Sequence, residues 1–293
     1  MLQWTATTTA LMMDRIGDKA VRHLLKNMTS NRSNSGVRQG HARVAVLLGL
    51  LVALHARAAD LTVVTSGGFA EAFKTLATRY ESLAPDRHIQ REFGPSMGTT
   101  SGAVPARLAR GEALDVVIMV EPALDQLMAR GQLLPGSKVR LALSKIACAV
   151  PSGAPRPPLD TEADVRQAFV RSPSVAWSDS ASGVYIQHEL LRHLGIEEEM
   201  RDKGRQIPAT PVGEIVARHE AALGCQQRSE LQPVAGIDIV GDLPDSLQRT
   251  TPYAAAVVAA SRHAPEARAF IAFLVDPASR PAIRATGLEA VLP

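Results

Sequence analysis

The chain has 293 residues, 46% hydrophobic and 21% charged, which is ordinary for a soluble globular protein. This length allows one large domain or two of about 110–150 residues. The formal net charge of +3 comes from the first 58 residues, and no Lys/Arg run is long enough for a nucleic-acid footprint, so we expect no nucleic-acid partner.

An apolar run near the N-terminus indicates an export signal. Residues 44–54 are eleven apolar residues in a row, preceded by Arg38 and Arg43 and followed by the small-x-small pattern Ala56-Arg57-Ala58. A bilayer span needs about 20 residues, whereas a signal-peptide core is shorter. We predict that residues 1–58 are a signal peptide, cleaved near Ala58, with a mis-assigned N-terminal extension; Met28 and, as an alternative, Met13 are the candidate true starts. The alternative is a buried N-terminal helix.

After this segment, short apolar strands alternate with helical patterns. Strand 115–120 is almost wholly apolar, as a central parallel strand is, and Pro122 occupies a favoured helix-start position. The alternation predicts an α/β fold with an open parallel sheet. The elements expected in this half are strand 61–65, helix 69–80, strand 89–93, helix 100–110, strand 115–120 and a helix from Pro122.

The alternation restarts around a Pro-rich stretch at 151–158. We predict two α/β lobes around a ligand cleft, with 59–143 and 242–293 in lobe 1 and 144–241 in lobe 2. The elements expected here are strands 145–150, 174–177, 224–227, 237–240 and 253–260, and helices 161–171, 185–194, 211–220, 265–275 and 277–286.

Three loops rich in small hydroxyl residues follow predicted strands, at 65–68, 95–100 and 178–183. Ligands of open α/β sheets bind beyond the carboxyl ends of the strands. Free N–H groups and the helix dipole favour an anion at such loops, and hydroxyls add neutral donors. Ser and Thr also cap helices without any ligand. Together the three loops predict a cleft for an oxyanion or carboxylates.

Other residue types point to no further chemistry. The histidines are scattered, and no nucleotide, dinucleotide or nucleophile-elbow fingerprint is present, so we expect no metal and no cofactor. Cys148 and Cys225 would lie in a compartment that allows disulfides. A bridge between them is possible, but the sequence alone does not establish it.

The loops, in this order, resemble the type II periplasmic solute-binding proteins, within them the molybdate-binding-protein-like family, over residues 60–293. Gln227 stands where that family has a Tyr hydroxyl, and Ser182 where it has Ala. Because Gln offers both a donor and an acceptor, the departure favours an organic acid over a bare tetrahedral oxyanion. The ligand contacts implied by the resemblance are Ser66, Gly67, Ser96, Met97, Ser182, Gly183, Tyr185, the backbone of Val212, and Gln227.

Residues 178–185 and 211–218 resemble a divergent subgroup that includes aconitate isomerase. The resemblance implies a monomeric periplasmic protein with one of two functions. It captures a small anion for an inner-membrane ABC transporter permease, or it interconverts trans- and cis-aconitate by proton transfer. A sensor domain that docks on a membrane receptor shares the first pattern. For the isomerase, the candidate bases are Asp179, Tyr185 and Glu121.

Overall fold

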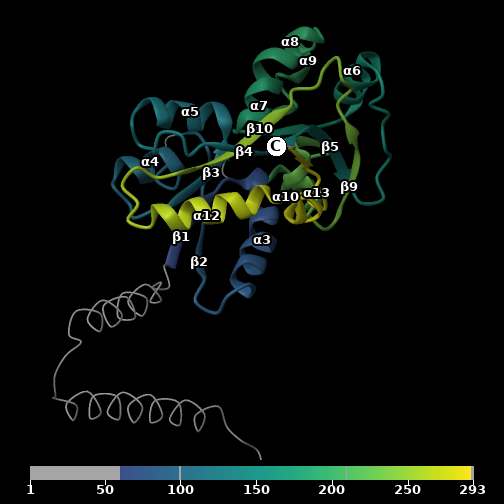
Figure 1. Ribbon diagram of the computed structural model, residues 1–293. Helices are drawn as coiled ribbons and strands as arrows, with labels where there is room; N and C mark the ends of the chain where they lie inside the picture. The colour runs from purple at the N-terminus through teal and green to yellow at the C-terminus, as the bar shows by residue number, and fades with distance from the viewer. Residues whose placement is uncertain (1–59, 99, 209, 292–293) are drawn as a thin grey trace, which may run out of the picture. The chain divides into compact units, whose positions relative to one another are not determined.

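The structure is a computed structural model that describes residues 60–98, 100–208 and 210–291. The predicted signal peptide and its cleavage at Ala58 lie outside these residues. The described residues form one compact unit built on two β-sheets (Figure 1). Among the residues that the structure describes, no helix is both long and apolar enough to cross a membrane.

The first sheet has six strands in the order β11-β4-β10-β3-β1-β2. Strands β1, β2 and β3 are parallel, whereas β10 runs antiparallel between β3 and β4. The strands are β1 (Asp60–Thr65), β2 (His88–Phe93), β3 (Val116–Val120), β4 (Val139–Ser144), β10 (Thr251–Val257) and β11 (Glu289–Ala290). Its helices are η1 (Gly67–Phe69), α3 (Ala70–Ser82), α4 (Val104–Ala109), α5 (Glu121–Ala129), α12 (Ala264–Val275), η3 (Pro277–Ser279) and α13 (Arg280–Arg284).

Strand β3 shows how this sheet is buried on both faces. Alternate side chains of a strand point to opposite faces. Val116 and Ile118 pack with Phe73 of α3 and Phe270 of α12 on one side. Val117 and Met119 of the same strand pack with α4 and α5 on the other. The continuous apolar run of β3 is therefore explained by helices on both faces of the sheet.

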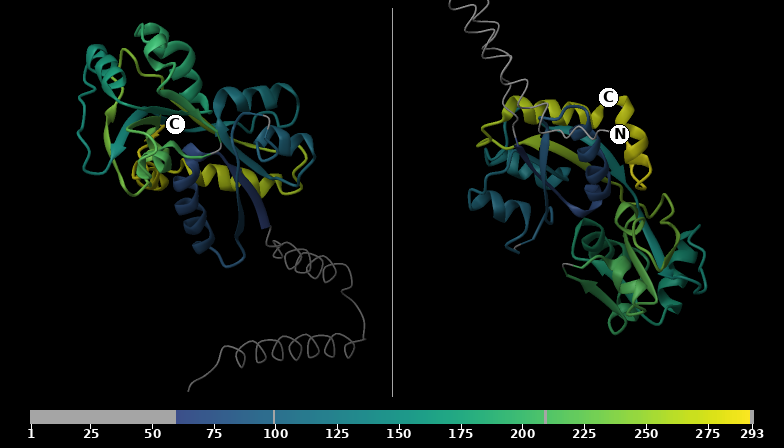
Figure 2. Two further views of the ribbon diagram at one scale, coloured as in Figure 1. Left: turned by 180° about the vertical axis from the view of Figure 1, so that it is seen from behind. Right: turned by 90° about the horizontal axis from the view of Figure 1, so that it is seen from below.

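The second sheet has the order β7-β6-β8-β5-β9, in which β6 is parallel to β7 and β8 while β5 is antiparallel to β8 and β9. Figure 2 shows it with its helices as a separate lobe (right view). The strands are β5 (Ile146–Pro151), β6 (Val175–Ser178), β7 (Gly204–Ile207), β8 (Leu223–Gln227) and β9 (Ile237–Asp242). The helices are α6 (Glu162–Arg171), α7 (Ala181–Tyr185), the π-helix η2 (Ile186–Leu190), α8 (Leu191–His193), α9 (Glu197–Met200), α10 (Val212–Ala217) and α11 (Arg228–Leu231).

The two-lobed α/β architecture predicted from sequence is confirmed, and β1, β2 and β3 form the parallel arrangement expected of them, to which β10 and β4 add antiparallel pairings. The chain passes between the sheets at Lys145 and again over residues 243–250, and β10 then returns antiparallel into the middle of the first sheet. Strands β4, β7 and β11 were not expected. We retain as a proposal the lobe ranges 59–143 with 242–293, and 144–241.

A disulfide joins Cys148 on β5 to Cys225 on β8. The two residues are register partners on adjacent strands, and both are fully buried. The bond therefore closes a loop of 77 residues inside the core of the second lobe.

We expect the Cys148→Ser/Cys225→Ser double variant to lose about 2–5 kcal/mol of unfolding free energy, the usual scale for a native disulfide that restricts the unfolded chain. Urea unfolding with and without dithiothreitol measures the change. The parent should weaken to the level of the variant in reductant, and the variant should not respond. A parent whose stability is the same in both buffers would contradict the expectation.

Candidate functional site

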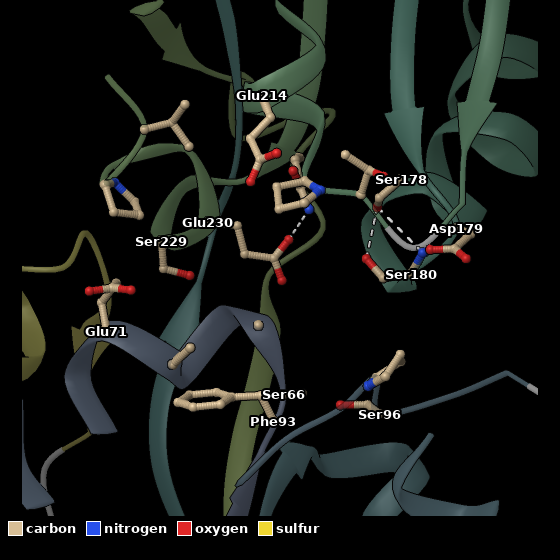
Figure 3. Close-up of a pocket in the computed structure, with 18 of the residues that line it drawn as sticks. Ser66, Glu71, Phe93, Ser96, Ser178, Asp179, Ser180, Glu214, Ser229 and Glu230 are labelled. Atoms are coloured by element: carbon tan, nitrogen blue, oxygen red, sulfur yellow. Dashed lines mark hydrogen bonds between the residues drawn. The ribbon is translucent and has the colours of Figure 1, made fainter. Parts of the chain in front are cut away.

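A pocket of about 830 Å³ lies between the two lobes (Figure 3). Its wall includes the residues that follow β1 and β2 in the first lobe and those that follow β6 in the second. The three hydroxyl-rich loops thus meet at one cavity. Of the site residues predicted from sequence, the wall contains Ser66, Gly67, Ser96 and Met97.

Ser66 and Gly67 form the first-lobe wall at the end of β1. The Ser66 backbone N–H donates to Ile118 O, which fixes the turn. The Ser66 hydroxyl is buried and has no hydrogen-bond partner within the described part of the chain. A buried hydroxyl without a partner is costly, so this atom is available for a ligand.

Ser96 and Met97 lie on the loop after β2. The Ser96 hydroxyl accepts a hydrogen bond from the backbone N–H of Val120, 3.0 Å away, and so ties this loop to the end of β3. Met97 is partly exposed at the wall. Ser96 therefore has a structural role in addition to facing the pocket.

Ser182, Gly183 and Tyr185 are not part of the wall. The Ser182 hydroxyl lies 3.2 Å from that of Ser178, and a Cβ on Gly183 would lie 1.6 Å from the Ser178 carbonyl oxygen. Because Gly183 has no side chain, α7 can pack against the end of β6, the strand that precedes it. The Tyr185 hydroxyl donates to Leu247 O at 2.7 Å. The wall uses the start of this loop instead, namely Ser178, Asp179 and Ser180.

Val212 and Gln227 are also bonded within the protein. The Val212 N–H donates to Gln226 Oε1 at 2.8 Å, and Gln227 Nε2 donates to Thr251 Oγ1 at 2.8 Å. Because neighbouring residues of β8 point to opposite faces, Gln226 lines the pocket and Gln227 does not. Ligand contacts by Ser182, Gly183, Tyr185, Val212 and Gln227 stay predictions.

Glu230 is a wall residue that sequence reasoning missed. It lies on α11, and the Gln226 amide donates to its Oε2. Burial raises the pKa of Glu230 to about 7; the Gln226 hydrogen bond opposes the rise and the charge of Asp179 adds to it. Burial, helped by Glu230, also raises the pKa of Tyr253, whose ring and hydroxyl lie against Gly68 where a Cβ would be only 2.0 Å from the hydroxyl.

The two cations of the wall are already paired. Lys74 Nζ lies 2.6 Å from Glu71 Oε1, and Arg218 Nη1 lies 3.5 Å from Glu214 Oε2, all four residues being on the wall. Asp179 and Glu230 are the other two acids of the wall, and neither forms an ion pair in the described ranges.

Of the three candidate bases, the wall contains Asp179 alone. Glu121 lies elsewhere, with its carboxylate 2.6 Å from Arg140 Nε and 3.1 Å from Lys138 Nζ. The hydrogen bond from Arg140, with that from Lys138, lowers the pKa of Glu121. Over residues 60–98, 100–208 and 210–291 there is no group of three or more His, Cys, Asp or Glu residues placed to hold a metal ion.

Similarity to known proteins, in sequence and in structure, identifies the family of this chain. The chain is 45% identical over 231 residues to an aconitate isomerase from a Pseudomonas species. The aligned region covers 79% of this chain and 88% of that protein. The structure of the periplasmic molybdate-binding protein of Azotobacter vinelandii matches 80% of this chain and all of its own, with a TM-score of 0.65 at 22% identity.

A substrate-binding domain of a putative molybdenum ABC transporter from Clostridium difficile matches 80% of this chain and 99% of its own, with a TM-score of 0.61 at 17% identity. At these identities the two structures show a shared fold. The family model described as bacterial extracellular solute-binding protein matches residues 61–289. The chain is therefore a member of the bacterial extracellular solute-binding protein family, with the two-lobed fold of the periplasmic binding proteins.

Proposed function

We propose that this protein is an isomerase of an unsaturated tricarboxylate, interconverting trans- and cis-aconitate in the periplasm. The observation that carries the proposal is the pair of wall carboxyl groups, Asp179 and Glu230, without cation partners among the described residues. A site that only captures an anion is weakened by such groups, because like charges repel. Proton transfer requires a group of this kind.

The reaction needs one proton to move between two carbons. A base takes a proton from the methylene next to a carboxylate, charge spreads over the three-carbon unit, and a proton returns at its other end. One C–H bond breaks and one forms, so no oxidant or reductant is needed. Donors for the developing charge are available in the Ser66 and Tyr253 hydroxyls, and the substrate's carboxylates can compete for Lys74 and Arg218.

The similarity to aconitate isomerase supports this assignment, because the aligned region covers 88% of that protein. The buried disulfide supports an oxidising compartment, in keeping with the export signal predicted for residues 1–58.

Capture of a small anion for a membrane transporter is the second candidate. It is favoured by the family match and by the fold shared with molybdate-binding proteins. It needs preorganised donors and no acid or base. Four carboxyl groups on the wall against two cations argue against a bare oxyanion as the captured ligand.

Incubation of residues 59–293 with trans-aconitate should yield cis-aconitate, which proton NMR of the mixture detects. Protein that is heat-denatured before it is incubated with trans-aconitate is the matched blank. A thermal-shift series with molybdate, tungstate, sulfate and citrate runs in parallel, since a ligand at 100 times its dissociation constant adds about 2.7 kcal/mol. Stabilisation by an anion without any conversion of trans-aconitate would favour the capture function.

Ser66→Ala should weaken binding of trans-aconitate by about 1–2 kcal/mol, the scale of a lost hydrogen bond. It should raise the unfolding free energy of the free protein, because the buried hydroxyl that it removes has no protein partner. Isothermal titration and urea unfolding measure the two quantities. Ser82→Ala, an exposed position on α3, is the control. If Ser66→Ala binds trans-aconitate as tightly as the parent, Ser66 is not a ligand contact. If Ser182→Ala binds trans-aconitate more weakly than the parent, the ligand site extends past Ser178 to Ser182.

A further inference from the structure

Glu230 occupies the place where the two lobes meet in the pocket. Helix α11 of the second lobe contacts η1 of the first, and a Cβ on Gly67 would lie 2.8 Å from Glu230 Oε1. The other carboxylate oxygen, Oε2, accepts from the Gln226 amide. Figure 3 shows the carboxyl group between the Ser66 side of the pocket and the loop that carries Ser178 and Ser180. A ligand that touches both lobes must pass next to it.

The groups around Glu230 leave its charge uncompensated. The charge of Asp179, from the loop after β6, raises the pKa of Glu230, and Glu230 in turn raises the pKa of Tyr253 on β10. The cation on its own helix, Arg228, pairs with Asp242 at 2.8 Å. On α10, Glu214 pairs with Arg218. Strand β5 and η1, which also contact α11, present no titratable side chain besides the bridged Cys148.

Asp179 and Tyr253 fit a proton-carrying role less well. The Asp179 residue is exposed, so water solvates its side chain, and no hydrogen bond within the described part of the chain orients it. Tyr253 is buried, and the rise of its pKa keeps its hydroxyl protonated at neutral pH. It can donate a hydrogen bond but does not act as a base there. Glu230 is partly buried, its carboxyl group is oriented by the Gln226 hydrogen bond, and its pKa of about 7 lies in the range suited to a general base.

We propose, on the basis of the proposed isomerase function, that Glu230 takes the proton from the substrate and returns it, and that Gln226 is a positioning residue for its carboxyl group. In the first step a substrate C–H bond breaks and a Glu230 O–H bond forms, while the electron pair enters the three-carbon unit. In the second step the O–H bond breaks and a C–H bond forms at the far carbon. Glu230 ends as a carboxylate, and the double bond has moved.

Gln226 positions this group through both ends of its amide. Its Oε1 accepts from the Val212 backbone at 2.8 Å, which fixes the amide orientation, and its Nε2 then faces Glu230. This hydrogen bond stabilises the ionised carboxyl group and limits the rise of its pKa. Loss of Gln226 should therefore move the pKa of Glu230 upward.

The experiment measures conversion of trans-aconitate by the parent, Glu230→Gln and Asp179→Asn. Glu230→Gln should lower kcat by about 100-fold or more, the scale of a lost general base, while trans-aconitate still binds within a few-fold of the parent affinity. Glu198→Gln, at an exposed position of α9, is the control. An active Glu230→Gln variant, or a larger loss in Asp179→Asn, would overturn the proposal; a parent that converts nothing would instead overturn the proposed function on which it rests.

Two pH measurements separate catalysis from structure. The kcat/KM of the parent should rise with pH up to about 7 and then level, because the ionised Glu230 is the base. Gln226→Ala should move this profile to higher pH, whereas a purely structural role for Gln226 would lower activity equally at every pH.

The second measurement does not depend on activity. Glu230 keeps its proton to about pH 7 in the folded chain, against 4.5 ordinarily, so the unfolded chain binds fewer protons in this window. The parent should therefore lose unfolding free energy between about pH 4.5 and 7 relative to Glu230→Gln. A constant difference over that range would show that Glu230 ionises normally and would overturn the proposal.

Discussion

The side-chain amide of Gln248 holds the two chain crossings together, and the site depends on it. Its Oε1 accepts from the Ile146 N–H at 2.8 Å, and its Nε2 donates to the carbonyls of Ile146 and Leu243. The same region anchors α11, since the Arg228 N–H donates to Lys145 O at 2.8 Å. Glu230 is two residues further along that helix. The joint between the lobes therefore determines where the pocket carboxyl group lies.

The parts of the fold that the sequence predicted are those with a strong local pattern. Helix α3 places Phe73, Leu76 and Tyr80 on one face, and β3 is apolar throughout, so both were recognisable. Strand β11 is two residues long and exists only because β4 lies beside it. The antiparallel course of β10 was equally unpredictable, because direction depends on the return of the chain from the second lobe and not on local residue pattern.

The site was predictable to the extent that it follows strand ends. Ser66 and Ser96 were found because hydroxyl-rich loops after parallel strands mark the mouth of an α/β sheet. The ligand contact of Gln227 was implied by resemblance and stays a prediction; in the structure its Nε2 donates to Thr251 Oγ1, and the neighbouring Gln226 lines the pocket. A shift of one residue reverses the face of a strand. Glu230 sits in a four-residue helix that carries no motif, so only the folded chain brings it to the wall.

An excess of acids in a site for a polyanion can still serve proton transfer. Glu71 and Glu214 pair with Lys74 and Arg218 at the wall, and in the proposed isomerase the carboxylates of the substrate would compete for these two cations. A bound tricarboxylate adds negative charge near Glu230, and this must raise the pKa of Glu230 further. The ionised form of Glu230 thus becomes a stronger base when the substrate is present, because taking a proton removes its repulsion with the substrate carboxylates. The charge repulsion that weakens capture is then the same interaction that drives proton abstraction.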